Sequence, residues 1–348
     1  MTVVDDQVRT IRHSVGLSRL DHLVCLRVSG DGAWELMNRV FPREVYVRDG
    51  QLVQGLILED SGVVAADCQL GNDEGEYMLL CEGLAADSLA DRLASSSADL
   101  DDVEITDEGR SRGAIGIDGP YAWELMSRMV GPEVVGLPYL TFFHFDGVTC
   151  CRTGKTGEYG YVLLVERDEV DACWSRLAEL GEGLDLREVG LEALEQCALE
   201  NWFFNIRREG SFELTPLELQ LQWRVSRRKS YVGSAALEER RRKGILRRLT
   251  CIVGEGPLDV GDPVHGDGGE RGIVLNAGHS HIRGDWVALA LLDLDYALPG
   301  VDMLTVGEGV SARTVTPPVI TNRSLYVNPQ VHSYASRDTD DFPPLVRG

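Results

Sequence analysis

The sequence predicts an α+β protein: a two-lobed body followed by a C-terminal antiparallel β unit. Three observations support this class. A strand-turn-helix pattern occurs twice in the body, short β runs fill the last third, and 348 residues suffice for two or three domains. We place the body at residues 1–243, with 46–112 as an inserted lobe, the β unit at 244–334, and a flexible tail at 335–348.

The repeat consists of two segments about 90 residues apart in the sequence. Residues 30–40 read GDGAWELMNRV and residues 119–129 read GPYAWELMSRM, each after an apolar run. A glycine turn followed by apolar residues three and four apart predicts an amphipathic helix. Two copies at this distance indicate two facing lobes, with room for a ligand between them, and not a solenoid of many short repeats.

The remaining elements follow from local patterns. Strands are predicted at 54–58, 63–68 and 77–81, and helices at 85–95, 168–180 and 191–200. After the proposed boundary, β runs alternate with Gly, Asp and Pro turns, which is typical of a small barrel or sandwich. These runs lie at 249–253, 272–276, 286–292, 302–306 and 310–315.

Composition excludes several classes of function. Thirty-four basic and 56 acidic residues give a net charge of -22, which repels nucleic acid and anionic lipid. The chain lacks a secretory leader pattern and an apolar stretch of about 20 residues, so we expect no membrane partner. The eight cysteines are scattered without metal-ligand spacing, which predicts reduced thiols, no metal site and a cytoplasmic protein.

Residues 152–160 read RTGKTGEYG between two apolar runs, 148–151 and 161–165. The pattern predicts a strand-turn-strand clamp whose glycines press against a flat ligand or an inner sheet. The embedded GKT is not a phosphate-binding loop, because Thr149 stands where that motif needs glycine and a strand, not a helix, follows.

This nonapeptide, called the clamp below, resembles the Arg-Thr-Gly-Tyr-Thr-Gly-Glu-x-Gly signature of the folate-dependent aminomethyltransferase family, which includes the T-protein of glycine cleavage and related demethylases. Lys155 stands at the aromatic position of that signature. Three further segments are similar to family motifs. They are LEDSGVVAAD at 58–67, GLEALEQCALE at 190–200, and LTPLELQLQWRV at 214–225 with KSYVG at 229–233.

The resemblance implies that tetrahydrofolate binds between the lobes. It puts Asp67 at the family's essential aspartate, near the N5/N10 edge, and Glu200 at the glutamate that holds the pterin. It also implies folate contacts for Arg152, Tyr161, Trp223 and Arg228. Simpler roles remain open from the residues themselves: a turn cap for Asp67, a core position for Trp223, and a solvated face for the basic run that contains Arg228.

The function expected from this resemblance is tetrahydrofolate-dependent transfer of a methyl, methylene or aminomethyl group to or from a small molecule. Lys155 and the segment 205–207, which replaces the family's Leu-Tyr-Gly, favour a reaction other than glycine cleavage. Nothing in the sequence indicates a carrier protein. The alternative is a non-catalytic folate-binding protein of iron-sulfur assembly, whose motif carries a cysteine that 152–158 lacks.

Overall fold

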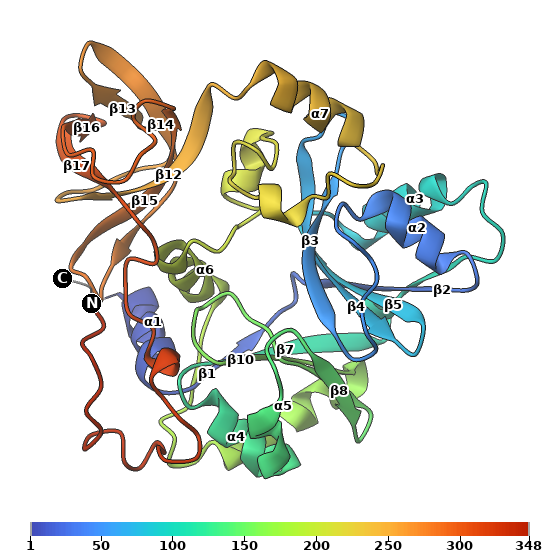
Figure 1. Cartoon of the computed structure of the whole chain (residues 1–348). Coiled ribbons are helices and arrows are strands. Elements are labelled where there is room, and N and C mark those ends of the chain that lie inside the picture. The colour runs from blue at the N-terminus through green and yellow to red at the C-terminus, as the bar shows by residue number, and fades with distance from the viewer. Residues whose placement is uncertain (1, 347–348) are drawn as a thin grey trace.

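The computed structural model describes residues 2–346 and confirms the α+β class. Two open sheets and a closed barrel surround the helix α6 (Leu191–Asn201), as Figure 1 shows. We call the two open sheets the inserted sheet and the clamp sheet. The barrel lies at the opposite end of the molecule from the inserted sheet (Figure 1).

The inserted sheet has the order β3-β4-β5-β2-β6, with all neighbours antiparallel. Its strands are β2 (Val24–Ser29), β3 (Leu52–Leu58), β4 (Val64–Asp73), β5 (Glu76–Glu82) and β6 (Glu104–Asp107). The helices α2 (Ala33–Val40) and α3 (Ala86–Ser96) contribute Leu36 and Leu89 to the core of this lobe. The sheet contains the strands expected over 46–112, but its β2 comes from before that range.

The clamp sheet has the order β11-β1-β7-β10-β9-β8. Its strands are β1 (Gly16–Arg19), β7 (Arg112–Asp118), β8 (Phe142–Phe145), β9 (Val148–Cys151), β10 (Gly160–Glu166) and β11 (Arg187–Glu188). The helices α4 (Ala122–Val130) and α5 (Val170–Leu180) cover one face, and α1 (Val3–His13) packs on α6. The predicted repeat is present, since α2 follows β2 in one lobe and α4 follows β7 in the other.

The C-terminal β unit is a closed barrel and not a sandwich, because β17 pairs with β12 and completes the ring. Its strands are β12 (Arg247–Gly254), β13 (Pro263–Gly266), β14 (Gly269–Ser280), β15 (Asp285–Asp293), β16 (Leu304–Val306) and β17 (Val310–Val315). The helix α7 (Ser234–Lys243) precedes it.

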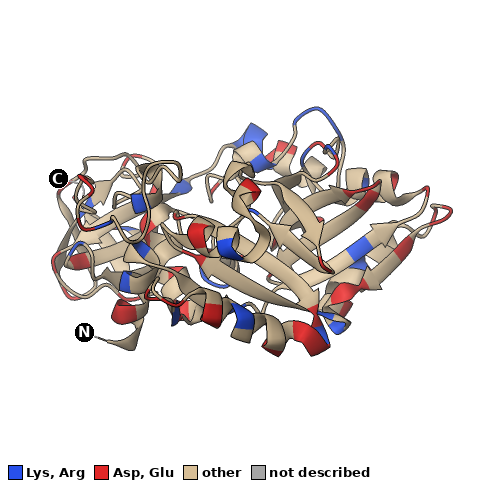
Figure 2. Ribbon diagram, turned by 90° about the horizontal axis from the view of Figure 1, so that it is seen from below, with Lys and Arg blue, Asp and Glu red and all other residues tan. Residues whose placement is uncertain are grey.

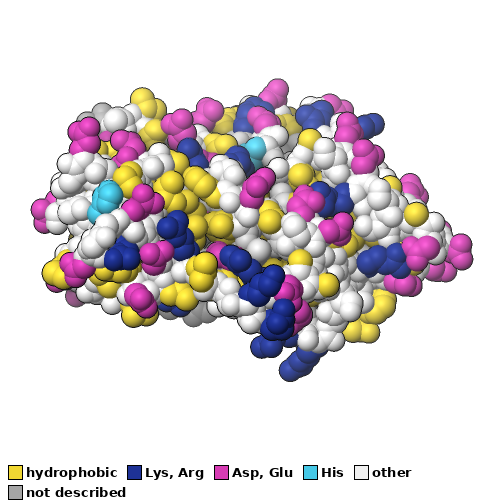
Figure 3. Space-filling model, turned by 90° about the horizontal axis from the view of Figure 1, so that it is seen from above, with side chains coloured by type: hydrophobic (Ala, Val, Ile, Leu, Met, Phe, Trp, Pro, Cys, Tyr) yellow, Lys and Arg dark blue, Asp and Glu magenta, His cyan; other side chains and the backbone are white. Residues whose placement is uncertain are grey.

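The basic run around α7 is partly neutralised by its own helix. Arg241 pairs with Glu238, and Arg242 and Lys243 pair with Glu239. Figure 3 shows a group of Lys and Arg side chains near the lower edge of the face. Elsewhere acidic and basic side chains are interspersed, as they are along the ribbon of Figure 2. Arg242 and Lys243 are exposed and match the solvated-helix interpretation, whereas Arg241 is largely covered.

The tail expected to be unpacked over 335–348 is mostly exposed or half-buried, but its end is anchored to the body. Leu345 is buried, its carbonyl accepts a hydrogen bond from the Thr321 amide, and Ile320 forms a β-bridge with Val346. Burial of an apolar side chain holds this segment against the body. Residues 347 and 348 of the predicted tail lie outside the described residues.

Two further features concern the whole chain. All eight cysteines are free and buried. Within residues 2–346, no helix combines the length and the apolar character needed to cross a membrane.

Candidate functional site

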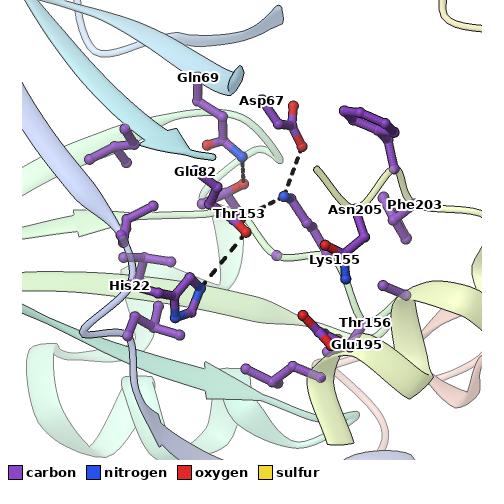
Figure 4. A pocket seen from close by; sticks show the side chains of 18 of the residues that line it. His22, Asp67, Gln69, Glu82, Thr153, Lys155, Thr156, Glu195, Phe203 and Asn205 are labelled. Atoms are coloured by element: carbon purple, nitrogen blue, oxygen red, sulfur yellow. Dashed lines mark hydrogen bonds and ion pairs between the residues drawn. The ribbon is translucent and has the colours of Figure 1, made fainter. Parts of the chain in front are cut away.

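A cavity of about 110 Å³ lies where the inserted sheet, the clamp and α6 meet. β4 and β5 contribute Asp67, Gln69, Leu80 and Glu82, the clamp contributes 153–156, and the connection after α6 contributes Phe203, Phe204, Asn205 and Arg207. On α6 the lining residues are Leu191, Leu194, Glu195 and Ala198, which share one helix face because they are three and four positions apart. Figure 4 shows ten of the lining side chains by name.

The clamp connects β9 and β10, as predicted. Its three glycines have two different structural roles. Gly157 has a positive φ of 81°. Gly154 and Gly160 instead allow close packing: a Cβ on Gly160 would lie 2.6 Å from the Thr153 carbonyl oxygen and 3.1 Å from the Gly154 Cα. Only glycine fits there without a shift, so the clamp can hold its polar side chains against the cavity.

Asp67 is buried in the cavity wall between two cations. Arg224 Nη1 donates a hydrogen bond of 2.6 Å to Asp67 Oδ1, and Lys155 Nζ lies 2.8 Å from Oδ2. The second contact is an ionic one without hydrogen-bond alignment, and Oδ2 is covered. A carboxylate on an apolar hairpin is costly unless it meets donors, and these two cations supply them.

Glu82 continues the same network. Its Oε1 accepts from Lys155 Nζ at 2.5 Å and its Oε2 from Arg207 Nη1 at 2.6 Å. Burial alone would raise the pKa of Glu82, but Lys155 and Arg207 outweigh it and lower the pKa to about 2. Figure 4 shows Lys155 reaching between Asp67 and Glu82. Glu82 is therefore charged at neutral pH.

The ion pairs extend from Glu82 to α6. Arg207 also donates to Glu195 through Nε at 2.9 Å, and Arg208 binds the other oxygen of Glu195. His22 lines the opposite wall with Nε2 3.8 Å from Glu82, and burial is the main cause that lowers its pKa. The cavity is thus an apolar pocket with one band of alternating charges.

Asp118, the last residue of β7, is a further carboxyl of this cavity. It is 7% exposed, and Thr156 Oγ1 donates to its Oδ1 at 2.8 Å. Burial raises the pKa of Asp118 to about 7, against the lowering effect of the Thr156 hydrogen bond.

Of the six site residues predicted from the sequence, Asp67 lines the cavity and the other five do not. Glu200 is fully buried on another face of α6, five residues and hence about 140° beyond Glu195. Its Oε2 accepts from Arg12 Nη2 at 2.8 Å and its Oε1 from Ser280 Oγ at 2.7 Å. Both oxygens face protein groups, so the structure does not bring Glu200 to the site.

The remaining four residues are not among those that line the cavity. Arg152 stacks on the rings of Tyr159 and Tyr161, with Tyr161 in the core of the clamp lobe. Trp223 is 54% exposed, so it is not a core residue. The guanidinium groups of Arg43 and Arg224 form cation–π contacts with its ring. Arg228 is exposed. Direct folate contacts of these residues stay predictions.

Three important residues escaped the sequence analysis. Arg12 is buried and joins α1 to the clamp and α6, through Thr156 O and Glu200. Its signal was an arginine on the apolar face of an amphipathic helix. No local sequence pattern identifies Arg224, because its partner Asp67 lies 157 residues away in the chain. Glu82 is likewise without a pattern, since it is simply the last residue of a strand.

The donor set of the cavity suits an organic ligand. No group of three or more His, Cys, Asp or Glu placed to hold a metal ion occurs among residues 2–346. Gln69 Oε1 and Arg224 Nε are buried without a hydrogen-bond partner in the described part of the chain. Together with the apolar side chains Leu80, Val162 and Leu194, they fit a flat, polar-edged ring such as a pterin.

Known proteins are similar to this chain in sequence. A family profile described as the GCVT N-terminal domain matches residues 1–229. The aminomethyltransferase of Desulfitobacterium hafniense is 25% identical over 324 residues, covering 90% of this chain and 88% of the relative. That of Frankia alni is 30% identical over 300 residues, covering 82% and 80%.

A solved structure shows the same fold. The crystal structure of glycine cleavage system aminomethyltransferase T from Bartonella henselae matches with a TM-score of 0.80 at 19% identity, covering 90% of this chain and 89% of that one. The profile match covers well over half of the chain, and the lobes, clamp and barrel match this solved fold. The chain therefore belongs to the GCVT family of aminomethyltransferases.

Proposed function

We propose that this protein binds tetrahydrofolate in the cavity between its lobes and transfers a one-carbon unit between the folate and a small molecule. The observation that supports this most is the position of Asp67. Arg224 holds this buried carboxylate at the wall of an apolar pocket in which some buried polar atoms have no hydrogen-bond partner. A buried charge in a pocket lined by apolar side chains and a few polar groups is typical of a functional site.

Different residues of the cavity would bind the pterin ring and stabilise charge on the reacting nitrogen. Leu80, Val162 and Leu194 supply apolar surface for the faces of the pterin, and Gln69 Oε1 supplies an acceptor at its edge. Bound folate supplies the nitrogen that carries the one-carbon unit. Asp67 favours positive charge on a nitrogen near it, because a carboxylate in an apolar pocket interacts more strongly than one in water.

Lys155 controls access to that carboxylate. Its ammonium group covers Asp67 Oδ2 and is shared with Glu82. A ligand nitrogen that reaches Oδ2 must compete with Lys155, which then keeps Glu82 as its partner. Lys155 thus tunes how strongly Asp67 acts on the ligand, at a position where the family signature has an aromatic ring.

The reaction within the family depends on Lys155, Asn205 and Ile206, the departures that favour a substrate other than the glycine-cleavage intermediate. Asn205 and Lys155 line the cavity, whereas Ile206 packs in the core behind it. The curated relatives are named aminomethyltransferases, so an assay for glycine cleavage belongs beside assays with methylated donors. Small-molecule donors and a cytoplasmic location form part of the same proposal, which does not require a carrier-protein partner and does not exclude one.

The alternative of a non-catalytic folate-binding protein for iron-sulfur assembly shares the same cavity. Asp67 distinguishes the two, because a folate-holding module needs the pocket but not a carboxylate at the reacting edge. A folate that binds and is never converted by any donor would favour the alternative.

The experiment combines binding and chemistry. Reduced folate at a hundred times its dissociation constant should stabilise the fold by about 2.7 kcal/mol, measured by thermal unfolding. Mass spectrometry of the folate after incubation with candidate donors then detects the transferred carbon. Unmoved unfolding and unmodified folate, with a T-protein control active in both assays, would overturn the proposal.

A further inference from the structure

Asp118 differs from the other carboxyls of the cavity. Asp67, Glu82 and Glu195 each bind two Lys or Arg side chains. Asp118 forms no ion pair with any residue of the described chain. A buried carboxyl without a cation is costly in an apolar wall, so its presence needs a reason.

The local structure is built to make room for this carboxyl. Asp118 pairs with Gly160 across β7 and β10. A Cβ on Gly154 or Gly160 would lie 3.0 or 3.1 Å from Asp118 Oδ1, so both glycines leave space for that oxygen. Thr156 Oγ1 donates to Oδ1, which retains a second lone pair.

The second oxygen is free for a ligand. Asp118 Oδ2 receives no hydrogen bond from the described residues, and, unlike Oδ2 of Asp67, it is not among the covered polar atoms. Asp118 lines the cavity beside Val162 and Leu194. A ligand lying on these apolar side chains can therefore present two N–H donors to one carboxylate.

An aminopyrimidine ring is the matching ligand chemistry. Its ring N–H and exocyclic amino group point the same way and fit the two oxygens of a carboxylate, as a guanidinium does. Glu200, for which family resemblance predicts this role, already has both oxygens bound by Arg12 and Ser280. Asp67, Glu82 and Glu195 are held by Lys and Arg, whereas Asp118 Oδ2 has no partner among the described residues.

We propose that Asp118 binds the aminopyrimidine edge of the pterin and thereby sets the orientation of folate in the cavity. This inference rests on the proposed function. It puts the pterin edge at the end of β7, against the clamp, and leaves the one-carbon edge toward Asp67 on the inserted sheet.

The proposal has a consequence for pH. Only the ionised carboxyl accepts two hydrogen bonds, and burial raises the pKa of Asp118 to about 7. The charges of Arg152 and Arg12 act on Asp118 and lower its pKa, and Glu158 faces the same region with a pKa raised by burial. His22, whose pKa is lowered from 6.5, titrates below the range of interest.

The apparent dissociation constant should follow the ionised fraction of Asp118. That fraction rises from about a quarter at pH 6.5 to nearly all at pH 8.5 for a pKa of about 7. The affinity for folate should therefore increase about fourfold over this interval.

Calorimetric titration with 5-formyltetrahydrofolate at pH 6.5, 7.5 and 8.5 tests the assignment. Asp118→Asn should weaken binding about 5- to 150-fold, because its amide group faces a ligand donor, and should remove the pH dependence. Asp146→Asn, an exposed loop control, should behave as the wild type. Thr156→Val should move the pH dependence upward, because it removes a hydrogen bond that favours the ionised carboxyl.

The outcomes separate the two levels of the argument. Wild-type binding with unchanged affinity and pH dependence in Asp118→Asn would overturn the assignment and leave the proposed function intact. No binding by the wild type at any pH would overturn the proposed function and the assignment with it. If Asp118→Asn fails to fold, the Thr156→Val shift decides, and an unshifted profile overturns the assignment.

Discussion

Replacing Glu200 by alanine should unfold the protein more readily and leave folate affinity unchanged. The Glu200 carboxylate and the Arg12 guanidinium are both fully buried, with Oε2 and Nη2 2.8 Å apart. Removal of one partner from such a pair costs about 3 to 5 kcal/mol, because the other charge stays buried. Ser280 Oγ also loses its acceptor, at about 1 kcal/mol.

The contacts that remain to Arg12 limit the loss of stability expected for Glu200→Ala. Arg12 keeps the Thr156 carbonyl, Glu158 and Asn322 as acceptors, so the ion-pair loss should lie near the lower end of its range. With the Ser280 contribution we expect a total of about 4 kcal/mol. With an m-value of about 3 kcal/mol/M or more, the urea midpoint should fall by roughly 1 M.

Urea unfolding followed by tryptophan fluorescence measures this effect. Glu192→Ala is the matched control, since Glu192 is exposed on the same helix and its removal should change stability by less than about 1 kcal/mol. Folate titration of the folded Glu200→Ala variant completes the test. Normal stability with a tenfold loss of folate affinity would show that Glu200 faces the ligand and would refute this reasoning.

Three further predictions follow from the site. Asp67→Asn should lower turnover by about 10²-fold or more and cost about 3 kcal/mol of stability, since its two cations lose a buried partner; unchanged turnover on a verified donor would reduce Asp67 to a structural residue. Gly160→Ala should destabilise the fold by about 1 to 3 kcal/mol, because the new Cβ would lie 2.6 Å from the Thr153 carbonyl oxygen. Gly136→Ala is the control and should be neutral, since a Cβ there meets nothing within 4 Å. Equal losses of stability in the two variants would refute the packing argument. Since the pKa of Glu82 is lowered from 4.5 to about 2, its contribution is complete above pH 4.5 and is lost as the pH falls toward 2; Glu82→Gln should flatten the pH dependence of stability there, and an unchanged slope would contradict the assignment.

The sequence predicted the parts of the fold that local patterns encode. The two AWELM helices, the glycine-rich turn between β9 and β10, and the short β runs after residue 244 all appear where their periodicity puts them. The first strand of the barrel, β12, begins at Arg247. What the pattern left open was the choice between barrel and sandwich, because ring closure is a long-range pairing.

The site was less predictable because it depends on partners far apart in the chain. Asp67 was predicted from its hairpin and lines the cavity, but the hairpin gave no sign of its partners Arg224 and Lys155. The face of Glu200 was fixed by Arg12, 188 residues away. Leu191, Leu194 and Glu195 share the face of α6 that lines the cavity, and Glu200 lies on another face.

The measurement that tests the central claim most directly is the crystal structure of the protein with 5-formyltetrahydrofolate, grown at pH 8. The account predicts the pterin ring in the cavity between Leu80 and Leu194, its aminopyrimidine edge on Asp118, and its one-carbon edge toward Asp67 and Lys155. Folate bound elsewhere, or an empty cavity at saturating folate, would contradict it.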